Sequence, residues 1–399
     1  MTSSDRIAAL AAVIAVAALL LSSPAFSRDF NDAPPNAPDQ SPAFEGQTRA
    51  PVLEAEPLAR QVIASGLDSP WGMAELPSSD WLVTERPGRL RRITPSGAVS
   101  APISGLPQVD SRRQGGLLDV VTGPDFATSR RIWISYAEPR GDGTTGTAVA
   151  TGQLSADGTA LTGTAVIFRQ QPGWDSTLHY GSRLVFDRDG ALFVTTGERS
   201  LPAPRQLAQD PATHLGKVLR IAPLGGPAMG NPALPGAVPE LWSLGHRNIQ
   251  GAALSPRGEL WTVEHGPRGG DELNRPEAGR NYGWPVITYG LDYSGAPIGA
   301  GLTRAEGMEQ PLYYWDPVIA PSGMVFYDGA LFPGWRGSLL IGGLASKALV
   351  RLTLDGTRVT GEARYLQGMD RIRDVAVDRD GAVMILTDGG QMMRLTPEG

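Results

Sequence analysis

The sequence predicts an all-β fold, a six-bladed β-propeller over residues 60–399. Three observations support this prediction. A strand–turn–strand phrase recurs six times, the 399-residue chain contains 50 Gly and 34 Pro residues, and 41% of the residues are hydrophobic against 19% that are charged. The Gly and Pro content indicates many turns between short elements and argues against a helical bundle. The hydrophobic content excludes a disordered chain.

Net charge and cysteine usage exclude several classes of protein. The formal net charge of −6 gives no reason to expect nucleic-acid binding, which needs a basic face. The chain has no Cys, so disulfides, thiolate metal sites and Cys nucleophiles are all excluded.

The first 27 residues are typical of a secretory signal peptide. Arg6 provides the charged start, an uncharged apolar run follows over Ile7–Leu21, and Pro24–Ser27 offers small residues for cleavage. The run is short for a membrane span, which needs ~20 apolar residues, although an uncleaved anchor is the alternative. We therefore expect a periplasmic or secreted protein with no stable membrane insertion after the leader is removed.

Residues 28–59 are rich in Pro and acidic side chains and have no apolar period. Such a segment has no apolar period with which to pack, so we expect a solvated linker or arm that is disordered.

From residue 60 onward the recurring phrase is a short apolar strand, a turn that often contains Gly, and a second apolar strand that often ends in an acid. A unit of this kind cannot bury both faces alone, and a radial arrangement of six units buries them against one another. A pair of β-sandwiches with chance similarity is the alternative. The six copies are Trp71–Ala74 with Trp81–Glu85, Gly116–Val120 with Ile132–Glu138, Arg183–Gly190 with Leu192–Glu198, Gly251–Gly258 with Leu260–Glu264, Gly323–Tyr327 with Leu339–Gly343, and Asp374–Gly381 with Val383–Asp388.

Two long inserts, residues 199–246 and 265–320, interrupt the repeats. Propellers place ligands at the mouth of the channel, on loops that rigid blades hold, so we expect the chemistry there. Polar phrases occur at 244–251, 264–272 and 279–285.

Two further features suggest a site. Arg371 and Arg373 lie two residues apart, so in a strand they share one side, where they need either an anion or pairing with Asp370 and Asp374. His179 directly precedes a predicted strand, where it is either a general base or a loop histidine with no role.

Together these phrases resemble one known family, the soluble aldose sugar dehydrogenases that depend on pyrroloquinoline quinone (PQQ), within the glucose/sorbosone dehydrogenases. The resemblance covers nearly all of residues 60–395, and this family is a six-bladed propeller. The motifs that carry it are Gly115–Asp119, His179–Leu184, Gly245–Asn248, Glu264–Pro267, Asn281–Pro285 and Arg371–Asp374.

The resemblance implies that the chain binds PQQ, which has three carboxylates and an ortho-quinone. Cations would hold the carboxylates, and polar side chains would complete the site. The implied cations are Arg247, Lys347, Arg371 and Arg373, and the implied polar partners are Gln114, Asn248 and Tyr293.

The resemblance also implies two calcium ions. Main-chain carbonyls of Gly266 and Pro267 would hold a catalytic Ca²⁺, and Glu272 with the backbone oxygen of Tyr282 would hold a structural one.

His179 is, by the same resemblance, the base that takes the proton of the anomeric hydroxyl while a hydride leaves C1, which gives a lactone. The sequence departs from the glucose-specialised branch of the family, in which an Asp precedes this His, because Leu178 stands here. Asp175 or another carboxylate is then expected to orient the ring, and the departure favours the broad-range aldose branch.

Two other functions are compatible with a propeller. A calcium-dependent lactonase or esterase would hold its metal with side chains such as the strand-end acids Glu85, Glu138, Glu198 and Glu264. A non-catalytic exported propeller that binds peptide or glycan would explain the repeat but not the Arg-rich phrases. The preferred prediction is a monomeric or homodimeric enzyme that acts on aldose sugars and passes electrons to an acceptor.

Overall fold

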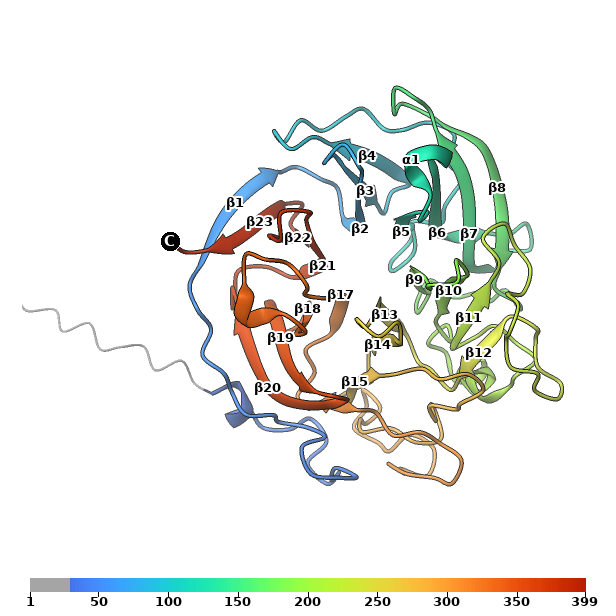
Figure 1. Cartoon of the computed structure of the whole chain (residues 1–399). Helices are drawn as coiled ribbons and strands as arrows, with labels where there is room; N and C mark the ends of the chain where they lie inside the picture. Colours follow the sequence, from blue (N-terminus) through green and yellow to red (C-terminus); the bar gives the residue numbers. More distant parts are fainter. Residues whose placement is uncertain (1–28) are drawn as a thin grey trace, which may run out of the picture.

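The computed structural model describes residues 29–399, whose strands form six sheets around a central channel (Figure 1). Five sheets have four strands and one has three. The predicted six-bladed β-propeller is therefore confirmed, and each predicted repeat supplies the first two strands of one blade. The predicted leader, residues 1–27, lies outside the described residues.

The blades are numbered here in chain order. Blade 1 contains β2 (Pro70–Glu75), β3 (Trp81–Glu85) and β4 (Arg89–Ile93); blade 2 contains β5 (Leu117–Thr122), β6 (Arg131–Pro139), β7 (Thr145–Leu154) and β8 (Leu161–Arg169); blade 3 contains β9 (Gly181–Phe186), β10 (Leu192–Thr196), β11 (Lys217–Ile221) and β12 (Leu241–Leu244). Blade 4 contains β13 (Ile249–Leu254), β14 (Leu260–Glu264), β15 (Asp271–Asn274) and β16 (Tyr313–Trp315); blade 5 contains β17 (Pro321–Phe326), β18 (Leu339–Gly343), β19 (Ala348–Asp355) and β20 (Arg358–Tyr365); blade 6 contains β21 (Ile372–Val377), β22 (Val383–Thr387), β23 (Met392–Pro397) and β1 (Leu58–Ala64).

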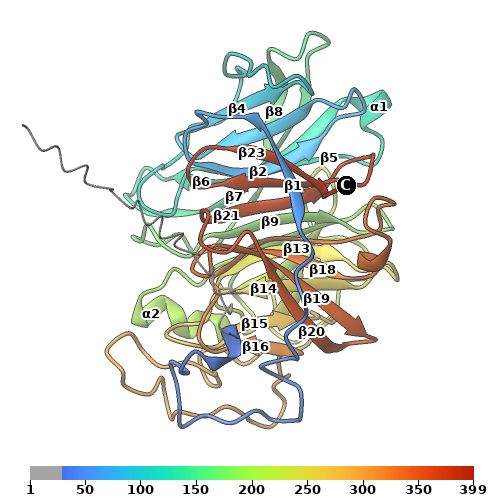
Figure 2. The same ribbon diagram turned by 90° about the vertical axis from the view of Figure 1, so that its left-hand side faces the viewer.

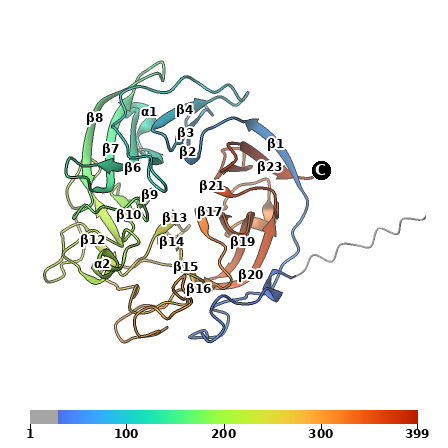
Figure 3. The ribbon, with the colours of Figure 1, turned by 180° about the vertical axis from the view of Figure 1, so that it is seen from behind.

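Blade 6 closes the ring by joining the two ends of the described chain. Strand β1 pairs antiparallel with β23, in a register that sets Leu58 opposite Pro397 and Arg60 opposite Leu395 (Figure 3). The closure joins segments more than 300 residues apart and leaves blade 6 with four strands.

Helices are few and short. They are α1 (Phe126–Ser129), α2 (Pro202–Arg205) and the 3₁₀ turns η1 (Phe30–Asp32), η2 (Gln206–Gln209) and η3 (Pro333–Trp335). Within residues 29–399, no helix has the length and apolar character that a membrane crossing requires.

The core lies between the blades. The second strands β3, β10, β14, β18 and β22 are buried at every position, because neighbouring blades cover both of their faces. A separate hydrophobic cluster fills each of the six blade junctions. Burial is thus spread around the ring, which leaves the channel mouth for polar side chains.

The register of every inner strand is interrupted near its first residues, at the channel mouth. In blade 6, Ile372 pairs with Thr387 and Asp374 with Leu386, so Arg373 is an extra residue. Gln250 is the extra residue of β13 in the same way. A β-bulge re-aims its side chain out of the regular alternation, and both of these side chains reach the cavity described below.

Residues 29–57 differ from the solvated linker that the sequence predicts. They form an arm that descends from β1 along the outside of blades 5 and 4 (Figure 2). Val52 bridges Glu362 of β20, and the Glu362 amide donates to the Pro51 carbonyl at 2.9 Å. Ala37, Gln47 and Ala50 are 2% exposed or less. Backbone hydrogen bonds and a few buried small side chains therefore replace the apolar periodicity that the segment lacks.

Candidate functional site

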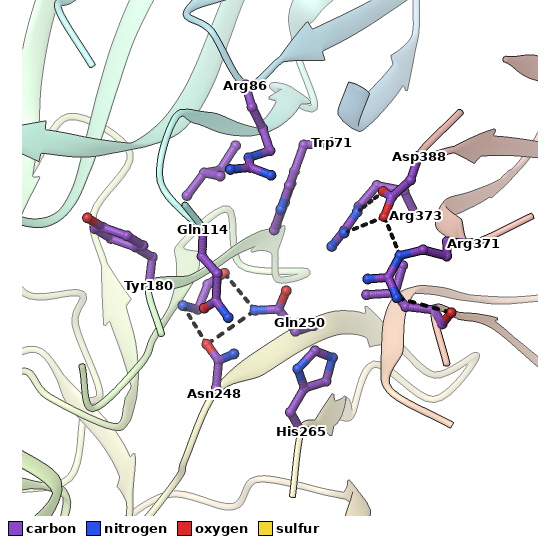
Figure 4. Close-up of a pocket in the computed structure, with 13 residues that line it drawn as sticks. Trp71, Arg86, Gln114, Tyr180, Asn248, Gln250, His265, Arg371, Arg373 and Asp388 are labelled. Carbon is purple, nitrogen blue, oxygen red and sulfur yellow. Dashed lines mark hydrogen bonds and ion pairs between the residues drawn. The ribbon is translucent and has the colours of Figure 1, made fainter. Parts of the chain in front are cut away.

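A cavity of about 220 Å³ opens at the channel mouth, where the inner strands begin (Figure 4). All six blades or the loops that connect them contribute side chains to it. Its polar and aromatic lining consists of Trp71, Arg86, Gln114, Tyr180, Asn248, Gln250, His265, Arg371, Arg373 and Asp388.

One wall of this cavity is cationic. Arg371 and Arg373 both bind Asp388, with Nε–carboxylate distances of 2.7 and 2.8 Å. Burial alone would raise the pKa of the Asp388 carboxyl, but the two guanidiniums outweigh it and hold that pKa below its ordinary value. Arg86 adds a third guanidinium, and burial followed by the charge of Arg373 lowers its pKa. Three cations against one carboxylate leave this wall with a net positive charge, which suits a polyanionic ligand.

The sequence offered Asp370 and Asp374 as possible partners of Arg371 and Arg373, and the side chains of these arginines pair differently. Their common carboxylate is Asp388, at the end of the neighbouring strand, and not Asp370 or Asp374. Asp374 instead binds Arg183 at 3.1 Å, deeper in the channel.

Amides line the opposite side of the cavity (Figure 4). The Gln114 oxygen accepts from the His179 amide at 2.8 Å, and the Asn248 oxygen accepts from the Gly181 amide at 3.1 Å and from Gln250 at 3.2 Å. Within residues 29–399 the NH₂ groups of Gln114 and Asn248 have no hydrogen-bond partner. Two neutral donors therefore face Arg371 and Arg373 across the cavity, whereas Arg86, whose Nε donates to the Gly115 carbonyl at 2.9 Å, lies on the side of Gln114.

His179 lies beside this amide wall on the turn before β9, with a positive φ of 49°. Its ring is 6% exposed, and Nδ1 lies 2.9 Å from Oε2 of Glu198, which is fully buried. Glu198 also accepts from the Trp284 indole at 3.2 Å and from the Ser200 amide. This contact fixes the tautomer: Nδ1 carries the proton, and Nε2 is the nitrogen that can accept one.

The pair also sets the charge of the ring. Burial lowers the pKa of His179, and Glu198 opposes this shift only in part. The pKa of Glu198 is also below its ordinary value, because its interaction with His179 and the charge of Arg247 outweigh its burial. The ground state is thus a neutral imidazole next to an ionised carboxylate, which is the arrangement that a general base needs.

The sequence left the group that orients His179 open between Asp175 and another carboxylate. Asp175 is exposed, and Glu198, just after β10, makes the contact. The position of Glu198 at a strand end could have indicated this role. In the sequence, that position supported only the competing lactonase interpretation.

Arg247 binds the start of the segment Gly266–Gly270. Its Nη1 donates to the Gly266 carbonyl at 2.7 Å and to the His265 carbonyl at 3.0 Å, while its buried Nε has no hydrogen-bond partner in the described part of the chain. The Tyr293 hydroxyl is 3.5 Å from Nη2, and Tyr293 itself is 72% exposed. A buried donor without a partner is expensive, so it indicates room for an acceptor from a ligand.

Lys347 lies on the turn between β18 and β19 and is exposed. Leu344 of the same turn lines the cavity, whereas Lys347 and Tyr293 do not. Of the predicted PQQ-binding residues, the structure gathers Gln114, Asn248, Arg371 and Arg373 in the cavity wall, places Arg247 beside them, and leaves Lys347 and Tyr293 at the surface.

The second predicted calcium site involves an acidic pair in blade 4, the buried Glu264 and the half-buried Glu272. Burial and then the charge of Glu264 raise the pKa of Glu272 well above its ordinary value. Asn274 donates to both carboxylates at 3.1 Å, and its buried Oδ1 has no partner in the described chain. Tyr282 stacks on His246, which binds Glu264. Uncompensated oxygens of this kind fit Ca²⁺ by their chemistry.

Several cavity residues were not predicted, namely Trp71, Arg86, His265 and Asp388. Asp388 entered the prediction only as the acid that ends the sixth repeat, and Arg86 directly follows Glu85, the acid that ends the first. Burial, followed by the charge of Arg247, lowers the pKa of His265 to about 3, so this imidazole remains neutral and its Nε2 donates to the Pro321 carbonyl at 2.8 Å.

The strand-end acids of the lactonase interpretation do not share a site. Glu85 binds Arg89 and Arg91, Glu138 binds Arg169, Glu198 binds His179, and Glu264 binds His246. Each acid has its own partner.

Comparisons with known proteins agree with this geometry. Residues 67–394 match the family model described as glucose/sorbosone dehydrogenase. The aldose sugar dehydrogenase YliI of Escherichia coli is 44% identical over 345 residues, which cover 84% of this chain and 92% of that protein. A crystal structure of a glucose dehydrogenase aligns with a TM-score of 0.81 and 47% identity over 86% of this chain and 99% of its own. The PQQ-bound aldose sugar dehydrogenase of Streptomyces coelicolor aligns with a TM-score of 0.71 and 29% identity, over 86% of this chain and 99% of its own.

Proposed function

Because the chain belongs to the glucose/sorbosone dehydrogenase family, we propose that it oxidises aldose sugars at C1 to the lactone, with PQQ and Ca²⁺ as cofactors. The observation that carries this proposal is the cavity itself. Arg371 and Arg373 face the amides of Gln114 and Asn248 across a cavity that Arg86 also lines. His179 is not among the lining residues, but it directly precedes the lining residue Tyr180 and its amide donates to Gln114. A cation-lined cavity beside a neutral, oriented imidazole suits a tricarboxylate cofactor and a base-assisted oxidation.

The residues present fit the proposed cofactors. When bound, PQQ supplies an ortho-quinone that takes up two electrons, and Ca²⁺ increases its electrophilicity. Arg371, Arg373 and Arg86 would hold carboxylates, with Gln114 and Asn248 as neutral donors. Gly266 and Pro267 would offer carbonyls to Ca²⁺. Arg247 already donates to the Gly266 carbonyl, so Ca²⁺ at this carbonyl would lie close to the positive charge of Arg247. An anionic ligand between Arg247 and Ca²⁺ would offset their repulsion and allow both to stay at this carbonyl.

His179 would act as the base. Its Nε2 accepts the proton of the anomeric hydroxyl, and the ionised Glu198 stabilises the imidazolium that results. Trp284 and the Ser200 amide hold Glu198 in place, so the ring has one orientation. Lys347 and Tyr293, which are exposed, are proposed as mobile contributors to the rim of the site.

The pH dependence tests the His179–Glu198 pair. Because the pKa of His179 lies below 6.5, kcat/KM is expected to fall only when the pH drops below that value. Glu198→Gln removes the charge that raises this pKa, so the acid limb moves to still lower pH. The lost charged hydrogen bond lowers kcat by about 10- to 100-fold. An acid limb that moves to higher pH in Glu198→Gln would exclude this role.

Calcium at Glu272 is proposed to be structural. Because the pKa of Glu272 is raised by folding, the calcium-free protein loses stability as the pH rises above the ordinary Glu value, and Ca²⁺ should restore it. At one hundred times Kd the metal adds about 2.7 kcal/mol to the free energy of unfolding. Thermal melting at pH 8 with and without Ca²⁺ measures this gain. Glu272→Gln should abolish it, and the exposed Glu306→Gln should not; a full gain in Glu272→Gln would refute the site.

We also propose export, to the periplasm or outside the cell, on the strength of the apolar run in residues 7–21. The acceptor of the electrons is then a molecule of the same compartment, and the protein acts as a monomer or homodimer.

Reconstitution tests the function directly. The purified protein is incubated with glucose and a dye acceptor, with PQQ and Ca²⁺ added together or singly. Dye reduction that needs both additions is expected. Hydrolysis of a lactone without PQQ, and no dye reduction, would replace the proposal by the lactonase.

A further inference from the structure

The arm formed by residues 29–57 contacts the same insert that contains Gly266–Gly270. It lies outside residues 67–394, the part of the chain that matches the family model. Its contacts with the insert include the side chain of Gln47 and the backbone of residues 36–37. Single hydrogen bonds also run from Gln40 to the Gly290 carbonyl, from Arg49 to the Asp316 carbonyl and from the Ala50 amide to the Tyr313 hydroxyl. Both supports adjoin the segment whose carbonyls are proposed to hold Ca²⁺.

Gln47 is the first support, and it is a fully buried polar side chain. Its Oε1 accepts from the Ala43 amide at 2.7 Å and lies 3.1 Å from the Tyr289 hydroxyl, and its Nε2 donates to the Pro311 carbonyl at 2.9 Å. The same hydroxyl also lies 2.6 Å from Oε1 of Gln310. The Tyr289 ring stacks on Tyr314 at 4.0 Å, and the Tyr314 amide donates to the Gln47 carbonyl at 2.8 Å. One arm residue thus fixes both sides of an aromatic stack inside the insert.

Asp316 is the second support. Its carboxylate accepts from the amides of Asn36 at 2.6 Å and Ala37 at 2.9 Å. Asn36 returns a contact, since its Oδ1 accepts from the Val318 amide at 3.2 Å. The arm therefore also anchors the chain just after β16.

These supports meet at the segment 266–270. Arg268 and Leu291 exchange two backbone hydrogen bonds of 2.9 Å, and the Gly270 amide donates to the Trp315 carbonyl at 3.0 Å. A Cβ at Gly290 would lie 2.3 Å from the Gly269 carbonyl oxygen and 2.7 Å from the Pro267 ring. The backbone after Tyr289 and the backbone around Asp316 therefore pack directly against the backbone of residues 266–270. A shift of either stretch is transmitted to residues 266–270.

We propose that Gln47 is a positioning residue that, through Tyr289, holds the segment Gly266–Gly270 in the conformation that the cofactor site requires. The link from this segment to calcium rests on the proposed function. The mechanical part of the inference, from Gln47 to the segment, does not depend on it.

Hydrogen exchange tests the mechanical part without any ligand. In Gln47→Ala the amides of Arg268 and Gly270 are expected to exchange about tenfold faster than in the wild type. The loss of the buried Gln47 amide leaves the Ala43 amide and the Pro311 carbonyl unpaired and leaves the Tyr289 hydroxyl with Gln310 alone. Tyr289→Phe keeps the stacked ring and removes only the hydroxyl, so it should also accelerate the exchange of these amides. This second variant keeps the test decisive if Gln47→Ala does not fold. The matched control is Glu56→Ala, on the same arm, whose partner Tyr365 belongs to blade 5.

Unchanged exchange at Arg268 and Gly270 in both variants, or an equal acceleration in Glu56→Ala, would overturn the inference.

Calcium titration by calorimetry in the presence of PQQ tests the second part, the link from the segment Gly266–Gly270 to the cofactor site. The affinity for Ca²⁺ should be about tenfold lower in Gln47→Ala and unchanged in Glu56→Ala. Wild-type affinity in a variant with accelerated exchange would break the link to the cofactor site. If the wild type binds neither PQQ nor Ca²⁺, the proposed function fails, and the exchange result still decides the role of Gln47.

Discussion

The His179→Ala variant should reduce kcat for an aldose sugar by about 10²- to 10⁴-fold, the usual contribution of a general base. The variant removes the imidazole that binds Glu198 and leaves the cations Arg86, Arg371 and Arg373 of the cavity in place. Its affinity for PQQ should therefore stay within a few-fold of the wild type. Steady-state kinetics at saturating PQQ and Ca²⁺, together with a PQQ titration, measure both quantities.

His214→Ala is the matched control for this variant. His214 is 9% exposed, close to the 6% of His179, and its ring contacts Phe168 and the Gln171 amide away from the cavity. We expect its kcat to remain near that of the wild type. Turnover by His179→Ala at the wild-type rate would refute the assignment of the base.

Loss of the cationic wall should give the second large effect. Replacement of both Arg371 and Arg373 by Ala is expected to weaken PQQ binding by at least about 100-fold, since each guanidinium can make a hydrogen bond to a charged group that is worth ~1.5–3 kcal/mol. Arg371→Ala alone should weaken binding more than it slows an enzyme saturated with PQQ. The double variant also leaves Asp388 as an unpaired negative charge that faces the ligand.

Arg379→Ala provides the control for the wall. The Arg379 side chain is 44% exposed, like the 45% of Arg371, and it also binds a carboxylate, that of Glu75 at 2.9 Å, but it lies outside the cavity. PQQ affinity should be unchanged in this variant. If the double variant keeps wild-type affinity for PQQ, the anion site is elsewhere.

The repeats made the fold predictable from the sequence. Each copy contained its own turn and two apolar strands, so the local pattern alone indicated six hairpins, and the ring followed from the need to bury their faces. The arm was not predictable in this way. Its contacts are mostly backbone hydrogen bonds to blades 4 and 5, such as those of Asn36 and Ala37 to Asp316, and such bonds leave no pattern in composition or hydrophobicity.

The candidate site was predictable only where a motif marked it. Gln114, Asn248, Arg371 and Arg373 belong to or adjoin the motifs that carry the resemblance, and the structure gathers them in one cavity. Glu198 and Asp388 were not assigned, because their partners, His179 and the two arginines, lie 15 to 19 residues away across a β-ladder whose register is broken by bulges. Sequence spacing cannot show which strand end meets which turn across such a bulge.

The cavity is proposed to be a tricarboxylate site that works together with a metal. Titration of the purified protein with PQQ, followed by the absorbance of the quinone with and without Ca²⁺, tests this claim most directly. We predict saturable binding of one PQQ per chain that tightens with Ca²⁺ and is lost when Arg371 and Arg373 are replaced. Absence of saturable binding, or binding indifferent to both the metal and these arginines, would contradict it.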